Sequence, residues 1–361
     1  MMQNLHGGLA SMEGNTRLLF YSVALVTGIF FSAWGLIEAK NILAPLITAI
    51  SLALVILPLA KWMERHSNRA VSSLVSTFLL FALSLIFLAV LSYQTKVFVD
   101  SWPEILETME PKIVQWKAVI TDNTFLGDSD LDILDGLSSS GDESGEGAPV
   151  VSMAGRGVGY IGTYLLTLIY VFFILNYRHR FRTFLLRLFA DEKGDEVDQI
   201  IQESGNVVVQ YLLGKLILIG VLALAYSIGL GITGVSNFIL VSIMAAVLTL
   251  IPYLGNIIGF VLAMVFGYLT SGEVGVLIGI LITFTIAQFL ESYILQPYVV
   301  GQKVDVHPFI VILAVIVGNA LWGVIGMILA IPVMGIITIL FLHIPALKPF
   351  GYLFSNREAD I

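Results

Sequence analysis

The chain has 361 residues, of which 57% are hydrophobic and only 12% are charged, and its formal net charge is −8. Soluble domains carry about 25% charged residues, so this composition excludes an ordinary water-soluble fold. Runs of about 20 apolar residues along most of the chain instead predict an all-α, polytopic helical membrane protein. The absence of cysteine excludes a disulfide framework and a thiolate metal site.

The apolar runs divide the chain into predicted membrane and extramembrane segments. Five plain spans are expected, at residues 18–37, 42–60, 71–93, 158–176 and 211–232. The predicted organisation is a cytoplasmic tail (1–17), spans one to three (18–95), an extracytoplasmic segment (96–150), span four (151–177), cytoplasmic interfacial helices (178–207), a transport core (208–345) and a second cytoplasmic tail (346–361). Residues 1–17 lack the apolar core of a cleaved signal peptide, so we interpret them as a tail.

Lysine and arginine residues in the loops predict the orientation of the spans. The loop after span two contains Lys61, Arg65 and Arg69, and the loop after span four contains four arginines, so both are expected in the cytoplasm. Residues 96–150 contain three lysines against twelve acidic residues and are expected on the outside. Both termini are then cytoplasmic.

The expected extracytoplasmic segment has two parts. Residues 101–120 carry apolar residues at helical spacing and predict an amphipathic helix, whereas residues 127–149 are acidic, rich in Gly and Ser, and predict a flexible loop. Asp128, Asp130 and Asp132 resemble the start of a calcium loop. That loop needs a glycine after its third aspartate and a glutamate at its twelfth position, and both are absent. No metal or cofactor site is therefore expected.

The cytoplasmic residues after span four combine an apolar stripe with arginines. Phe181, Phe184, Leu185 and Leu188 share one helix face beside four arginines. Such a helix is typical of the headgroup region of an anionic membrane. We expect residues 178–207 to lie along the inner surface of the bilayer.

Two long apolar runs, 238–271 and 309–342, are too long for one span and short for two. Glycine and proline weaken helices, so the simplest shape for each run is a broken or re-entrant hairpin, with a kinked pair of ordinary helices as the alternative. With one further span at 277–295, the fold has about eight membrane elements. The residues expected to break helices are Pro252, Gly255, Gly259, Pro297, Gly301, Gly318, Gly323, Gly326 and Pro332.

Three stretches of the C-terminal part carry a family resemblance. IPYLGNIIG (251–259), ESYILQPYVVGQKVDVHPF (291–309) and GNALWGVIGMILAIPVMGII (318–337) resemble the autoinducer-2 exporter family of bacterial inner-membrane proteins. The resemblance extends over essentially the whole chain, except the acidic insert at 127–149. It implies passive or ion-coupled transport of a small solute, with autoinducer-2 export and sodium/proton antiport as two activities assigned to members. It also implies a homo-oligomer in the inner membrane.

Polar residues in the predicted core are the candidates for a substrate or ion pathway: Glu291, Gln288, Asn256, Asn319 and Gln296. Paired, interrupted apolar segments are typical of transporter binding sites, and an acid within a membrane segment is costly unless it functions or is paired. The alternatives are an interfacial anchor or structural hydrogen bond for Glu291, and helix capping for the two asparagines. Lys215 is interpreted as an interfacial lysine whose ammonium reaches the membrane surface.

Enzyme motifs are absent: the chain has no Walker A, G-x-S-x-G or H-E-x-x-H sequence. We therefore predict a non-enzymatic permease that moves a small polar solute, with Na⁺ or H⁺ as a possible coupling ion, the lipid bilayer as solvent and no nucleic-acid partner. Sodium/proton antiport is the first alternative. A non-transporting scaffold that holds a partner through residues 101–149 is the second.

Overall fold

The computed structural model describes residues 30–100, 148–188, 194–252, 254–300 and 306–356, together with positions 21, 23, 24, 26–28 and 103. The described elements are all helices, which confirms the all-α prediction, and seven of them are long and apolar enough to cross a membrane. In chain order they are α2 (Lys40–Glu64), α3 (Arg69–Asp100), α6 (Ala148–Leu188), α7 (Gly194–Ile232), α8 (Phe238–Leu248), α9 (Leu254–Ser271), α10 (Val274–Phe289), the π-helix η2 (Leu290–Val300), α11 (Pro308–Trp322), α12 (Val324–His343), the 3₁₀-helix η3 (Pro345–Leu347) and α13 (Lys348–Phe354).

The helices include the predicted spans but extend beyond them. Span two lies in α2, span three in α3 and span four in α6. The expected interfacial helices are not separate elements, because residues 178–188 continue α6 and residues 194–206 continue α7 without a break. Most positions of the first predicted span lie among the described residues and are helical, including 30–38, whereas the segment at 104–147 lies entirely outside them.

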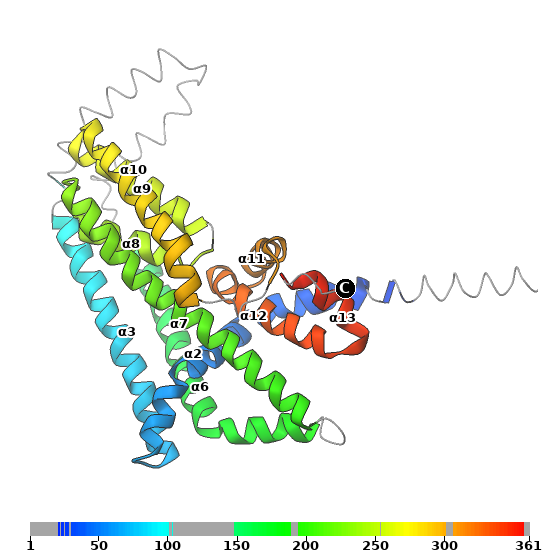
Figure 1. Cartoon of the computed structure of the whole chain (residues 1–361). Coiled ribbons are helices and arrows are strands. Elements are labelled where there is room, and N and C mark those ends of the chain that lie inside the picture. The colour runs from blue at the N-terminus through cyan, green and yellow to red at the C-terminus, as the bar shows by residue number, and fades with distance from the viewer. Residues whose placement is uncertain are drawn as a thin grey trace, which may run out of the picture.

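Helix α7 is the central element of the fold. Its 39 residues make a rod roughly 58 Å long at 1.5 Å per residue. It packs against α8, α10 and η2 and also against α2, α6 and α12. In Figure 1, α8, α9 and α10 gather toward one end of α7, whereas α11, α12 and α13 form a separate group.

The apolar side chains form three separate cores. The largest joins α7, α8, α9 and α10 around Leu222, Tyr226 and Ile280. A second lies mainly between α11 and α12, around Val315 and Met327, and a third lies between α2 and α6. Many other large apolar side chains on these helices are exposed, as expected where lipid is the solvent.

Both long apolar runs divide into two helices, as the positions of glycine and proline predict. In the first, α8 ends at Leu248 and α9 begins at Leu254, with the buried Pro252 in the break. In the second, α11 ends at Trp322 and α12 begins at Val324. Gly323 forms the break with φ of +63°, a conformation that side chains with a Cβ rarely adopt.

Several residues expected to break helices lie inside them instead. Gly255 and Gly259 belong to α9, where their missing side chains let α9 approach the backbone of α8 closely. Gly318 of α11 and Gly326 of α12 face each other across the crossing of these helices in the same way. Pro332 lies within α12, and the chain continues past Pro297 as the π-helix η2. Gly301 lies outside the described residues.

Candidate functional site

The candidate site is centred on Glu291 in the first turn of η2. The span predicted at 277–295 changes there from α-helical to π-helical hydrogen bonding, because α10 ends at Phe289 and η2 begins at Leu290. π-Helical segments within α-helices occur frequently at functional sites. The Glu291 side chain is only 3% exposed, so its carboxylate is shielded from both lipid and water.

Lys215 supplies the positive charge that faces this carboxylate. Its Nζ lies 3.9 Å from Oε1 of Glu291 and 3.5 Å from the main-chain oxygen of Thr249. Lys215 is buried, which is the opposite of the interfacial position expected from the sequence. Thr249 caps the C-terminus of α8, where unpaired carbonyls attract a cation, so Lys215 connects α7 to both the break and the carboxylate.

Two amides complete the polar cluster. Nδ2 of Asn256 donates to Oε2 of Glu291 at 2.9 Å and to Oε1 of Gln288 at 2.9 Å. Asn256 lies in the first turn of α9, directly after the break, and Gln288 lies near the end of α10. Asn256 is half-buried and Gln288 is exposed, so the cluster runs from a reachable amide to a buried ion pair.

Aromatic packing shields one side of the site. Tyr226 of α7 stacks on Phe284 of α10 at 4.4 Å between ring centroids, and Phe260 of α9 packs edge-on against Phe284. All three belong to the core of α7 to α10. In such an apolar environment, removing one member of a buried ion pair typically costs about 3–5 kcal/mol, because the other charge is left uncompensated.

The other predicted site residues are not brought to this cluster. Asn319 lies near the end of α11, is exposed, and makes no hydrogen bond to the cluster among the described residues. Gln296 of η2 is also exposed. The structure therefore groups Glu291, Gln288 and Asn256, separates Asn319 and Gln296 from them, and adds Lys215.

Sequence comparison assigns the chain to a family. The model of the AI-2E family transporters matches residues 19–346, which include every element of the site. The chain belongs to the AI-2E transporter family. This confirms the resemblance that the Gly/Pro-interrupted motifs indicate, and it supports a membrane transporter.

Curated relatives of this AI-2E chain carry names of the same kind. The candidate transport protein YueF of Bacillus subtilis (strain 168) is 29% identical over 190 residues, which is 52% of this chain and 51% of YueF. The candidate transport protein YrrI of the same organism is 32% identical over 133 residues, or 37% of each chain. The matched regions thus span about half the length of these relatives or less.

Proposed function

We propose that this AI-2E family chain is a permease that moves a small polar solute across the bacterial inner membrane, and that the cluster around Glu291 is part of its pathway. The main support is a polar cluster between membrane helices, in which hydrogen bonds and an ion pair connect Asn256, Gln288, Glu291 and Lys215. Buried polar groups in lipid are expensive, and a folded protein tolerates them where they bind, conduct or pair. The exposed end of this set gives a solute a place to enter.

The chemistry of the cluster suits a hydroxylated solute. The Asn256 and Gln288 amides can donate and accept hydrogen bonds, and the Glu291 carboxylate accepts them strongly. A polyol that replaced the bond between Asn256 and Gln288 would reach the carboxylate behind it. Autoinducer-2, a small furanosyl compound, belongs to this class, so its export is the substrate hypothesis that we adopt.

Helix lengths support re-entrant hairpins around this pathway. Helix α8 has 11 residues and α11 has 15, or roughly 16 and 22 Å, which is less than the roughly 30 Å of a bilayer's hydrocarbon core. Unwound backbone at membrane depth is tolerated where protein or a water-filled cavity covers it. We expect both breaks to lie within the membrane, both termini to be cytoplasmic, and several copies of the chain to assemble.

A second candidate function rests on the same ion pair. The Lys215 ammonium lies 3.9 Å from the Glu291 carboxylate. Na⁺ can take its place beside the carboxylate if Lys215 releases one proton and becomes a neutral amine. Sodium/proton antiport would use this exchange directly. It predicts sodium-dependent proton movement, whereas solute export by itself does not.

Reconstitution into proteoliposomes tests both candidates. Vesicles loaded with labelled autoinducer-2 or another small polyol should release it faster with the protein than without it, and Glu291→Gln or Asn256→Ala should slow release about tenfold, which equals ~1.4 kcal/mol of activation free energy. A pH-sensitive dye in the same vesicles reports proton movement driven by a sodium gradient. Proton movement without solute release would favour antiport.

Glu273→Gln is the matched control, because Glu273 is an exposed acid just before the first residue of the same α10 helix. It should transport like the wild type. The double variant Lys215→Met with Glu291→Gln removes both charges, so no unpaired buried charge destabilises the fold. Loss of transport in this variant then reflects the pathway and not misfolding. Normal transport by a folded Glu291→Gln variant would remove this cluster from the pathway.

A further inference from the structure

A large cavity lies apart from the Glu291 cluster, among α2, α6, α7 and α12. Its volume is about 1350 Å³. Apolar side chains line much of it, among them Leu46, Leu54 and Leu57 of α2, Ile174 of α6 and Val209 of α7. None of the residues of the Glu291 cluster contributes to its walls.

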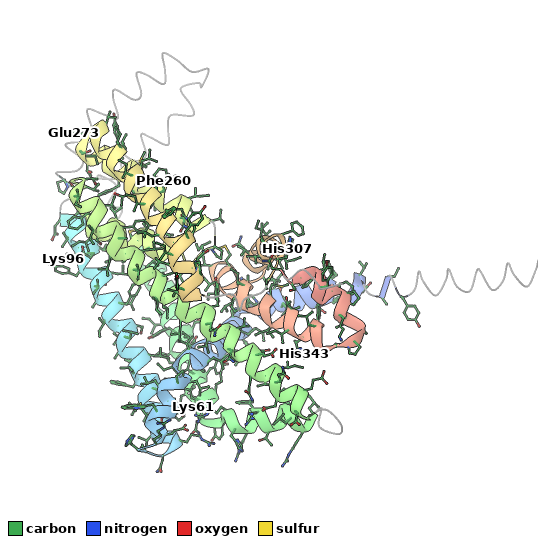
Figure 2. All side chains as sticks on the ribbon, viewed as in Figure 1. Lys61, Lys96, Phe260, Glu273, His307 and His343 are labelled. Carbon is green, nitrogen blue, oxygen red and sulfur yellow. The ribbon has the colours of Figure 1, made fainter. Side chains whose placement is uncertain are left out.

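One end of this cavity is basic. Lys61, Arg69, Arg178 and Arg182 line it, together with His179, His343 and a single acid, Glu196. Figure 2 labels Lys61 and His343, which mark the ends of two of the surrounding helices, α2 and α12. The opposite end, near Leu46, is apolar.

Two of the four strong bases already have acidic partners. Arg178 forms a two-pronged ion pair with Glu64, and Arg182 donates to both carboxylate oxygens of Asp198, at 2.9 and 2.8 Å. Lys61 and Arg69 are exposed and form no direct ion pair with any described residue, and the nearby Glu64 carboxylate attracts both only at longer range. The cavity therefore presents two cations that no direct ion pair engages, so an anion that occupies it can bind both.

The cavity has the polarity pattern of an anionic amphiphile. From Leu46 to Lys61 the wall of α2 extends roughly 22 Å, which is longer than the roughly 15 Å half-thickness of the hydrocarbon core. Basic pockets between membrane helices bind anionic lipid headgroups. A free phosphate would use the basic end alone and leave the apolar walls empty.

We infer that this cavity binds one anionic phospholipid, with its phosphate beside Lys61 and Arg69 and an acyl chain between α2 and α7. The lipid then lies between two surfaces of the cavity, one formed by the packed helices α2 and α6 and the other by the packed helices α7 and α12. Because a ligand that binds only the folded state stabilises it, occupancy raises the melting temperature.

Native mass spectrometry of the full chain in detergent tests this inference. The probes are phosphatidylglycerol, phosphatidylcholine with the same acyl chains, and inorganic phosphate. We expect one phosphatidylglycerol to be retained and to raise the melting temperature, with little retention of phosphatidylcholine and no stabilisation by phosphate. Equal retention of both lipids, or equal stabilisation by phosphate, would overturn the inference.

Variants locate the lipid. Lys61→Gln with Arg69→Gln should weaken phosphatidylglycerol retention about 30-fold, from the usual contribution of two basic residues near an anionic surface. The control pair Lys96→Gln with Lys348→Gln removes two exposed lysines that do not line the cavity, and should retain the lipid. An equal loss in both pairs would mean surface attraction only.

Leu54→Trp tests the apolar walls separately. Leu54 of α2 lines the cavity opposite Gly205 of α7. A methyl group on Gly205 would lie 3.8 Å from the Leu54 side chain, so the two helices are close at this point. The larger ring should fill that space and displace the acyl chain while all four bases remain. Unchanged retention by a folded Leu54→Trp variant would refute binding inside the cavity.

Discussion

The two broken helix pairs look alike in sequence and differ in structure. Each contains a Gly-Asn dipeptide, and in each a glycine allows two helices to pack closely. Yet Asn256 of the α8–α9 pair binds Glu291 and Gln288, whereas Asn319 of the α11–α12 pair is exposed. The α11–α12 pair instead connects to the N-terminal part of the chain, since Trp322 Nε1 donates to the Leu36 carbonyl at 3.1 Å.

This difference shows that a shared break in an apolar run does not imply a shared role. What distinguishes the α8–α9 pair is its neighbour α7, which carries a buried lysine to the break. The α11–α12 pair has an apolar core and no described charge of that kind between its helices. The predictions below test whether polar chemistry is confined to the first pair.

The largest effect is expected from breaking the ion pair. Lys215→Met leaves the Glu291 carboxylate buried without a cation and should lower the free energy of unfolding by about 3–5 kcal/mol. Adding Glu291→Gln should recover most of that loss, because no uncompensated charge remains. Denaturant unfolding in detergent measures both, with the exposed Lys348→Met as control. Independent, additive effects of the two substitutions would show that the charges do not interact.

The two asparagines give the most direct contrast between the pairs. Asn256→Ala removes a hydrogen bond to a buried carboxylate and should lower the free energy of unfolding by about 1.5–3 kcal/mol. It should also reduce transport. Asn319→Ala removes an exposed side chain and should change stability by less than about 0.5 kcal/mol. Unfolding and vesicle flux of the two variants, measured side by side, decide the matter. Equal loss of flux in both would give the pairs equivalent roles.

The glycine crossings test packing alone. Gly318→Ala places a methyl group against the backbone of Gly326 and should cost about 1–3 kcal/mol of stability while leaving flux per folded protein unchanged. Gly255→Ala meets the backbone of α8, next to Asn256, and should lower both stability and flux. Gly275→Ala has open space around it and serves as the control. A flux defect in a folded Gly318→Ala variant would contradict the proposal that only the α8–α9 pair takes part in transport.

The smallest effect is expected at the link between α11 and the N-terminal part of the chain. Trp322→Phe keeps an aromatic ring but removes the hydrogen bond to Leu36, so it should lower the free energy of unfolding by about 0.5–1.5 kcal/mol. Vesicle flux should stay at the wild-type level. A larger loss would indicate that this contact orients the whole α11–α12 pair.

Much of the fold follows from apolar run lengths and from glycine and proline. The breaks before Leu254 and at Gly323 were predictable, because Pro252 lacks an amide hydrogen and Gly323 tolerates a positive φ. The resemblance to the family was also visible in the motifs around these breaks. Neither the change to a π-helix at Leu290 nor the continuation of α7 down to Gly194 was predictable from these patterns.

The site was only partly predictable, for a geometric reason. Glu291, Gln288 and Asn256 stand out as polar residues in apolar runs, but their grouping depends on how α9 crosses α10. Lys215 lies 76 positions before Glu291, and a lysine near one end of a predicted span is usually an interfacial one. Because α7 extends far beyond that predicted span, Lys215 lies well inside the helix. For the same reason, the sequence did not predict that Val209 of α7 lines the cavity.

The unbroken length of α7 has a mechanical consequence. Gly205, at the cavity, and Lys215, at the ion pair, are ten residues apart on one hydrogen-bonded rod, or roughly 15 Å. Between these positions α7 is a continuous α-helix without proline or a π-bulge, which are two common causes of a sharp kink. We expect a tilt or slide of α7 at one of these positions to move the other as well, because the same continuous helix contributes to the cavity and to the buried ion pair.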